Sequence, residues 1–254
     1  MLLEGKNAVI YGGGGSIGGA VARAFTREGA KVFLAGRTLA TLDRVADEID
    51  GAGGGAETAE VDALDEKAVD EHADAVAKQH GSLDISFNLI THPHTHGVPF
   101  HEMEADDFMA PVEVAARATF ITARAAARQM IRQRAGVILA FGGPGDRSGP
   151  ARDYYLGGTQ VAFDAIETMR RQFSVELGPH GIRFVTLASG GVPETFSPDF
   201  EGAPDITRMI EDQTLLGRAA TLEDVGNAAV FAASDWARST TAAIINVSAG
   251  ALID

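Results

Sequence analysis

The sequence predicts an α/β fold: a doubly wound, parallel, seven-stranded sheet in a single domain that spans residues 1–254. Short apolar runs alternate with longer segments of helical periodicity, which is typical of βαβ units with right-handed crossovers. Several apolar runs contain almost no polar residue, as in parallel strands that are covered on both faces. The expected strands are 7–11, 31–35, 57–61, 85–90, 136–141, 183–188 and 244–247.

Helices are expected between these strands. In the first, Ala20, Ala24 and Phe25 recur near helical spacing, and Arg23 lies on the opposite side. Thr221 is followed by two acids, which is typical of a helix start. The expected helices are 17–28, 39–49, 66–80, 106–134, 155–177, 205–214 and 222–233.

Composition excludes several classes of protein. The formal net charge is −14, whereas a nucleic-acid-binding surface needs a basic face. The chain has no cysteine, which excludes disulfides, thiolate nucleophiles and cysteine-ligated zinc. Its first residues run into a strand without the design of a signal peptide, and no apolar run is long enough to span a bilayer. We therefore expect a cytoplasmic protein with a small-molecule substrate and no nucleic-acid or membrane partner.

A glycine-rich turn joins the first strand to the first helix over residues 9–18. Glycines in such a turn let the backbone approach a pyrophosphate closely, and the helix N-terminus supplies free N–H groups for the anion. Ser16 stands where a further glycine would be expected, and its hydroxyl would donate to a phosphate or cap the helix. The strand before and the helix after the turn predict a Rossmann-type dinucleotide site. The predicted phosphate contacts are Gly12, Gly14, Ser16, Ile17 and Gly18.

The end of the second strand indicates which dinucleotide binds. Folds that prefer NAD usually carry an acid here, which bonds to the ribose 2′-hydroxyl, whereas an arginine accommodates a 2′-phosphate. Arg37 stands at this position, and Gly36 leaves no acid before it. Arg37 therefore favours NADP as the cofactor, with NAD as the alternative.

These features make the chain resemble the short-chain dehydrogenase/reductase family over essentially its whole length. The family's opening glycine motif matches from Tyr11 to Gly18, although Tyr11 replaces a threonine and Ser16 replaces the middle glycine. The acid that the family places beside the adenine matches Asp62. Further stretches that are similar to the family are 178–183, 216–225, 231–235 and 244–250.

The resemblance implies an NADP-binding oxidoreductase that acts on a carbonyl or alcohol, or on an activated double bond, of a small organic substrate. It implies Tyr155 as the general acid/base and residues 191–214 as a lid over the substrate. It also implies a homodimer or homotetramer, assembled through the alanine-rich helix 106–134 and the helix that carries Tyr155. Beyond the glycine turn and Arg37, the cofactor contacts that it implies are Asp62, Ala63, Asn88, Tyr155, Gly190 and Val192.

The catalytic end departs from the family pattern. The family's catalytic asparagine falls at about Ala115 and its serine on Gly143, or on Gly142 if the match is shifted by one. Its lysine falls on Thr159, four residues after Tyr155. A tyrosine has an unperturbed pKa of about 10, so Tyr155 would be a poor base at neutral pH without a nearby cation. The arginines that could supply this charge are Arg117, Arg147 and Arg152. Two alternatives follow: a nucleotide-binding relative that has lost catalysis, or a non-redox enzyme such as a dehydratase or isomerase.

A histidine cluster follows the fourth strand, at the carboxyl edge where ligands bind in this fold. It consists of His92, His94 and His96, with His101 beyond. Histidine titrates near neutrality, so one of them could act as an acid/base in place of the missing groups. The alternatives are a metal site or a polar loop that faces solvent. We expect no metal site, because no nearby acid has a clear ligand spacing.

Overall fold

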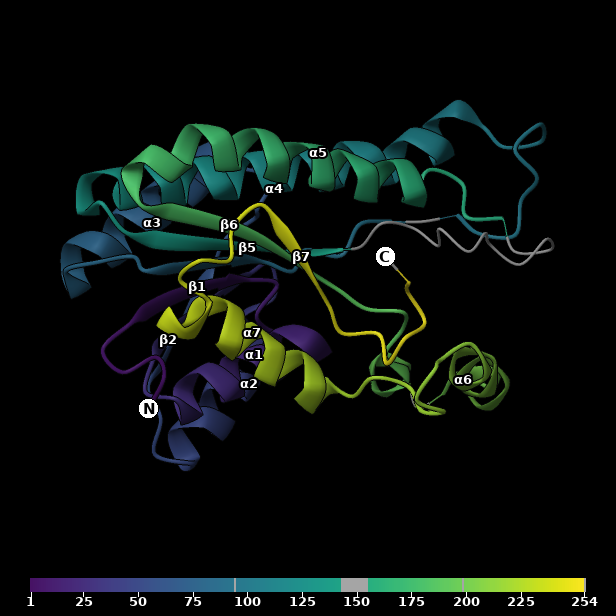
Figure 1. The fold of residues 1–254 in the computed structure, drawn as a ribbon, viewed down its shortest axis with the longest axis horizontal. Helices are drawn as coiled ribbons and strands as arrows, with labels where there is room; N and C mark the ends of the chain where they lie inside the picture. The colour runs from purple at the N-terminus through teal and green to yellow at the C-terminus, as the bar shows by residue number, and fades with distance from the viewer. Residues whose placement is uncertain (94, 143–154, 198, 254) are drawn as a thin grey trace.

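A computed structural model describes residues 1–93, 95–142, 155–197 and 199–253. Its centre is one sheet of seven parallel strands, in the order β3-β2-β1-β4-β5-β6-β7 (Figure 1). The predicted fold class, a doubly wound Rossmann-type sheet in one domain, is confirmed. The strands are β1 (Asn7–Tyr11), β2 (Lys31–Gly36), β3 (Ala56–Glu60), β4 (Ile85–Asn88), β5 (Gly136–Gly142), β6 (Ile182–Ala188) and β7 (Ala243–Asn246).

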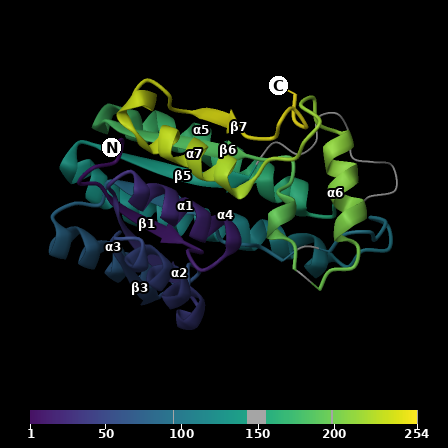
Figure 2. The ribbon, with the colours of Figure 1, turned by 90° about the horizontal axis from the view of Figure 1, so that it is seen from below.

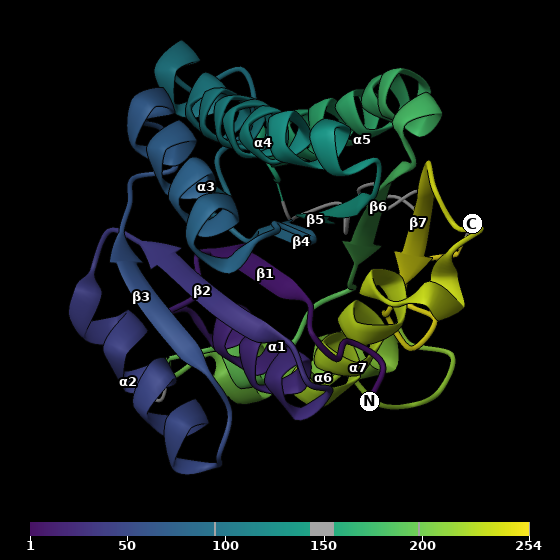
Figure 3. The same cartoon turned by 90° about the vertical axis from the view of Figure 1, so that its left-hand side faces the viewer.

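Helices cover both faces of the sheet (Figure 3). One face carries α1, α2 and α7, and the other carries α3, α4 and α5. Figure 1 shows α6 beyond the end of the sheet. No helix within the described ranges is both long and apolar enough to cross a membrane. The helices are α1 (Ser16–Arg27), α2 (Leu39–Gly51), α3 (Glu66–His80), α4 (Ala105–Gln133), α5 (Thr159–Leu177), α6 (Ala203–Asp212) and α7 (Leu222–Ala233).

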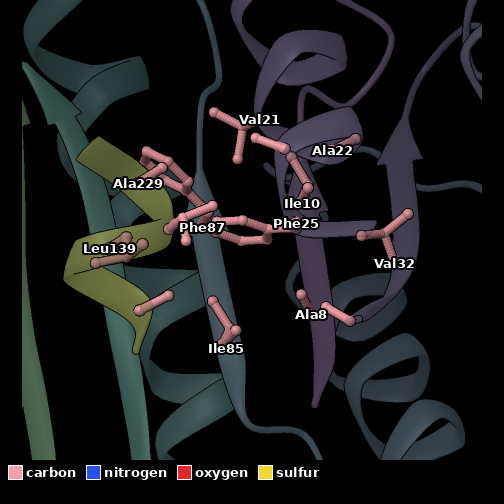
Figure 4. Packing of buried hydrophobic residues seen from close by; sticks show 14 of the residues in the cluster. Ala8, Ile10, Val21, Ala22, Phe25, Val32, Ile85, Phe87, Leu139 and Ala229 are labelled. Carbon is pink, nitrogen blue, oxygen red and sulfur yellow. The ribbon is translucent and has the colours of Figure 1, made fainter. Parts of the chain in front are cut away.

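Each face of the sheet has its own hydrophobic core, because successive residues of a strand point to opposite faces. On one side, the side chain of Phe25 from α1 is fully buried, and Figure 4 shows it among Ile10, Phe87 and Ala229. Helices α1 and α7 lie side by side over this core (Figure 2). At Gly226 of α7 an added Cβ would lie 3.0 Å from the Cβ of Ala24 on α1, so the glycine allows the two helices to pack closely.

The helix bounds agree with the sequence within two residues except at α5, which begins at Thr159 rather than at Tyr155. The cause is a pair of glycines. Gly157 has a φ of +55°, which is not a right-handed helical conformation. At Gly158 an added Cβ would collide with the carbonyl oxygen of Phe108, so α4 leaves no room for a side chain there. Tyr155 therefore lies outside the helix.

The direction in which successive strands are added to the sheet reverses at β1. Tyr11 at the end of β1 pairs with Ala35 on β2 and with Asn88 on β4. The chain runs outward from β1 to β3 and then returns to β4 on the other side of β1. At such a switch point the connections leave in opposite directions, so a crevice opens at the carboxyl ends of the strands.

The turn between β1 and α1 sits at this switch point and is packed too tightly for side chains. Gly12 has a φ of +83°, and an added Cβ would lie 2.6 Å from the carbonyl oxygen of Leu89. An added Cβ at Gly18 would collide with the carbonyl oxygen of Gly12. The first turn of α1 therefore lies directly against the end of β1, and β1 against the segment after β4.

We predict that Gly18→Ala lowers the free energy of unfolding by about 1–3 kcal/mol, because the new methyl group overlaps backbone that cannot move alone. The matched control is Gly15→Ala, where an added Cβ would lie 3.4 Å from the same oxygen and φ is −79°. Denaturant unfolding of both variants measures the difference. Equal stability of the two variants would contradict this packing.

Candidate functional site

The N-terminus of α1 is open toward the crevice. Its N-cap is Gly15, which has no side chain to accept a hydrogen bond, and the first turn contains no acid. Gly19 donates its N–H to the carbonyl of Gly15, so the N–H groups of Ser16 and Ile17 precede the first N–H that bonds within the helix. Ser16 is exposed and Ile17 is half-buried. Free N–H groups and the positive end of the helix dipole form a site for an anion.

Arg37 stands beside the glycine turn. An added Cβ at Gly14 would collide with the side chain of Thr41, so α2 begins directly against the turn. The Thr41 hydroxyl donates to the carbonyl of Thr38 over 2.8 Å, which fixes the segment that follows Arg37. The Arg37 side chain is exposed, and no described residue forms an ion pair or hydrogen bond with it. Its charge therefore remains available to an anionic group.

Asp62 and Ala63 follow the neighbouring strand, β3. The Asp62 carboxylate accepts a hydrogen bond from the N–H of Leu64 over 3.0 Å, and its side chain is exposed. Ala63 is buried. Because β3 pairs with β2 up to Gly36, these two residues end next to Arg37 along the same edge of the sheet.

Asn88 holds the end of β4 in place. Its amide nitrogen donates to the hydroxyl of Thr119 on α4 over 3.1 Å, and its amide oxygen accepts from the N–H of Ile90 over 3.0 Å. Thr119 is buried, one helical turn after Ala115. The sequence does not predict Thr119 as the hydrogen-bond partner of Asn88. The only feature that points to it is its place as a threonine within an alanine-rich stretch of α4.

Gly190 and Val192 follow β6 and lead into the predicted lid. Val192 is buried within the core on the α1 side, so the chain returns from β6 to the glycine turn. Gly191 has a φ of +124°, and an added Cβ would lie 2.9 Å from the side chain of Ile210 on α6. The predicted lid, residues 191–214, contains the 3₁₀ turn Pro193–Thr195 and helix α6.

Tyr155 lies before α5, beside the segment that follows β4. Its side chain is 42% exposed, and its carbonyl accepts the N–H of Gly97 over 2.9 Å. Tyr11 is closer to the glycine turn but is fully buried in the core. Burial, together with the negative charge of Asp70, raises the pKa of Tyr11 far above its usual range. Of these two phenols, only Tyr155 is open to a substrate.

The histidine segment contacts the start of α5. The Nε2 atom of His96 lies 3.2 Å from the hydroxyl oxygen of Thr159, and the ring of His92 meets the ring of Phe163 edge-on with centroids 5.5 Å apart. No pattern in the sequence predicts the contact between His96 and Thr159. Among the described residues, no His, Asp and Glu side chains gather as a metal site.

Several sequence candidates fall elsewhere. Arg117 is exposed on α4. The candidates Gly143, Arg147, Arg152 and His94 lie outside the described residues. The four lysines are Lys6, Lys31, Lys67 and Lys78, so no lysine occurs in the part of the chain that contains the tyrosine.

The predicted cofactor residues follow strands β1, β2, β3, β4 and β6. They therefore lie along the edge formed by the carboxyl ends of the strands. The glycine cradle and the open N-terminus of α1 fit the phosphates of a dinucleotide. The residues that would hold it are those that the sequence predicts at these strand ends.

Comparison with known proteins agrees with this architecture. A family model described as enoyl-(acyl carrier protein) reductase matches residues 13–251. The chain is 30% identical over 253 residues to short chain aldehyde dehydrogenase 1 of Euphorbia lathyris, covering 93% of this chain and 84% of the relative. It is 28% identical to L-xylulose reductase of Bos taurus, covering 98% of each chain.

Solved structures show the same fold. Carveol dehydrogenase from Mycobacterium avium, determined in complex with NAD, superposes with a TM-score of 0.87 at 25% identity over 98% of each chain. The family match extends over nearly the whole chain, and it agrees with the strand order and with the glycine turn. This chain belongs to the short-chain dehydrogenase/reductase family.

Proposed function

We propose that this protein is an NADP-dependent oxidoreductase that acts on the carbonyl or alcohol group of a small organic molecule. The observation that carries the proposal is the open N-terminus of α1 at the β1–α1 turn, together with Arg37, which pairs with none of the described residues. The relatives named as dehydrogenases and reductases support the reaction class. The substrate itself is left open, except that it must carry an oxidisable or reducible carbon–oxygen group.

The roles of the residues follow from their positions. When bound, the nicotinamide supplies or accepts a hydride. The N-terminus of α1 would bind the pyrophosphate, Arg37 the 2′-phosphate, and Asp62 the adenine side. Asn88 keeps the end of β4 in place through Thr119. The Tyr155 hydroxyl would donate a proton to the carbonyl oxygen as it gains negative charge.

A second candidate function is nucleotide binding without catalysis. Two observations favour it: the chain has no lysine after Lys78, and Tyr155 lies before α5 rather than on it. A non-redox reaction, such as dehydration or isomerisation, would use the same crevice. Turnover of a carbonyl substrate distinguishes these candidates from the proposal.

We predict that the purified protein consumes NADPH with at least one member of a panel of ketones, aldehydes and enones. In Tyr155→Phe, kcat should fall by about 10²- to 10⁴-fold, the usual contribution of a positioned acid. Loss of the reduced nicotinamide absorbance measures both. Tight NADPH binding with no turnover on any substrate would contradict the proposal and favour the non-catalytic candidate.

We predict that Arg37→Ala shifts the preference from NADPH towards NADH. The ratio of the two kcat/KM values should change by about tenfold or more, since a hydrogen bond to a charged group contributes about 1.5–3 kcal/mol. The matched control is Arg44→Ala, an exposed arginine of α2 whose partner is Glu48. An unchanged preference in Arg37→Ala would contradict the assignment of NADP.

We also propose that the chain forms a homodimer or homotetramer through α4 and α5. The alanines of α4 are mostly buried within the subunit, so they do not form this surface. Exposed apolar side chains on the two helices would do so instead, and they include Phe120, Ile131, Val161 and Val175. Sedimentation velocity should give twice or four times the mass of one chain. A monomer at micromolar concentration would contradict the proposal.

A further inference from the structure

The segment that follows β4 lies against the turn that carries Tyr155. The N–H of Gly97 donates to the carbonyl of Tyr155 over 2.9 Å. At Gly158 an added Cβ would collide with the carbonyl oxygen of Phe108, so the start of α4 lies against the same turn. Residues 97–113 therefore flank the tyrosine that is open to a substrate.

The predicted lid, residues 191–214, is the second segment at this end of the molecule. Its helix α6 has one buried residue, Ile210, which packs against Gly191 just after β6. Figure 1 shows both the lid and residues 97–113 beyond the carboxyl ends of the strands. We refer to residues 97–113 and 191–214 as the entrance segments.

The entrance segments carry a large excess of negative charge. Residues 97–113 contain five acids and no lysine or arginine, and residues 191–214 contain six acids and one arginine. Residues 143–154, which precede Tyr155 in the sequence, contain two acids and two arginines, so they add no net charge. The acids of the entrance segments are Glu102, Glu104, Asp106, Asp107, Glu113, Glu194, Asp199, Glu201, Asp205, Glu211 and Asp212.

Most of this charge is not compensated. All of these acids are exposed. Glu102 lies 3.3 Å from the ring of His101, and Asp205 lies 3.7 Å from the guanidinium of Arg208. The Glu194 carboxylate accepts the N–H of Leu222 at the start of α7. The remaining carboxylates form no ion pair with any residue that the structure describes.

The balance of charge is reversed at the glycine turn. The turn and α1, residues 12–27, contain two arginines and no acid, and the positive end of the α1 dipole is open to the crevice. Arg37 adds a further exposed cation beside the turn. An anion is therefore favoured at the α1 end of the crevice and disfavoured between the entrance segments.

We propose that the carbonyl substrate carries no carboxylate or phosphate, and that the entrance segments select against anions. This inference rests on the oxidoreductase function proposed above. Like charges at an entrance lower the local concentration of an anion and its rate of association. Exposed apolar side chains of the same segments fit the uncharged body of such a substrate. They are Phe100, Met109, Phe200 and Met209.

Because the chain has no cysteine, the charge at the entrance can be measured without turnover. Phe100→Cys and Met209→Cys each place one thiol on an exposed position of an entrance segment. The probes are 2-(trimethylammonio)ethyl and 2-sulfonatoethyl methanethiosulfonate, which differ in the sign of their charge. At an ionic strength of about 10 mM, the ratio of cationic to anionic reaction rates should exceed that of 2-mercaptoethanol by about tenfold or more. At about 1 M salt this excess should disappear, because the Debye length falls to about 3 Å.

The matched control is Ser16→Cys, which places the thiol on the exposed first residue of α1. There the same ratio should fall below that of 2-mercaptoethanol, since the helix dipole and Arg37 favour the anionic reagent. A ratio of two rates at one thiol does not depend on the reactivity of that thiol.

The second test uses three aldehydes of one shape: 4-carboxybenzaldehyde, 4-methylbenzaldehyde and 4-(trimethylammonio)benzaldehyde. At about 10 mM ionic strength, kcat/KM for the carboxylate should be about tenfold or more below that for the methyl compound. The cation should not show this loss. High salt should reduce the difference, which separates the effect of charge from the electronic effect of the substituent.

Neutralising acids of the entrance segments should weaken the discrimination at low salt. The variant combines Glu104→Gln, Asp107→Asn and Glu201→Gln, and its kcat/KM for the carboxylate should rise relative to that for the methyl compound by about threefold or more.

The control variant changes net charge equally but at exposed acids away from the entrance, and it should keep the wild-type ratio. It combines Glu4→Gln, Asp47→Asn and Glu71→Gln. Equal reagent ratios at Phe100→Cys and Ser16→Cys, or equal reduction of the carboxylate and methyl compounds at low salt, would overturn this inference alone. A wild-type protein that reduces no carbonyl compound would overturn it together with the proposed function.

Discussion

The structure depends on one steric constraint, the absence of side chains where β1 turns into α1. Gly12 touches the backbone after β4, and Gly18 touches Gly12, so three segments meet without a Cβ between them. This contact sets α1 at the end of β1 with its N–H groups toward the crevice. The parallel pairing of β4 with β1 places the same turn where the order of the strands reverses. The open N-terminus of α1 therefore lies at the switch point of the sheet.

The opposite side of the crevice is shaped by a second pair of glycines. Gly157 and Gly158 stop α5 from extending back to Tyr155, and they let α4 and the histidine segment approach. Thr159 is the buried first residue of α5, and its hydroxyl contacts His96. In this chain a threonine and a histidine thus meet where the related family has a lysine. On the nucleotide side, Tyr11 and Ser16 depart from the family's glycine motif, whereas on the side of the reacting group the positions of the catalytic asparagine, serine and lysine are all replaced.

The fold could be predicted from the sequence because its signals are local. Apolar runs such as 183–188, and the start of α7 at Thr221, each carry their own pattern, and the capping box at Thr221 is present. The start of α5 could not be predicted in the same way. Helical periodicity continues back to Tyr155, but Gly157 has a positive φ and Gly158 lies against Phe108, a residue distant in the sequence, so the helix begins at Thr159.

In the candidate site, too, features with a local sequence pattern could be predicted, and contacts between distant residues could not. Each strand end is predictable, because parallel strands bring their carboxyl ends to one edge. The side-chain pairs across the crevice were not, since Asn88 with Thr119 and His96 with Thr159 join residues separated by 31 and 63 positions. A pattern within one segment contains no information on such partners. The resemblance to the family could not supply them either, since it expects an asparagine at Ala115 and a lysine at Thr159.

Isothermal titration calorimetry of the wild-type chain with NADPH measures directly whether the β1–α1 turn binds a dinucleotide phosphate, because it needs no substrate. We predict saturable binding at one site per chain, tighter for NADPH than for NADH. If neither nucleotide binds, the turn is not a dinucleotide site.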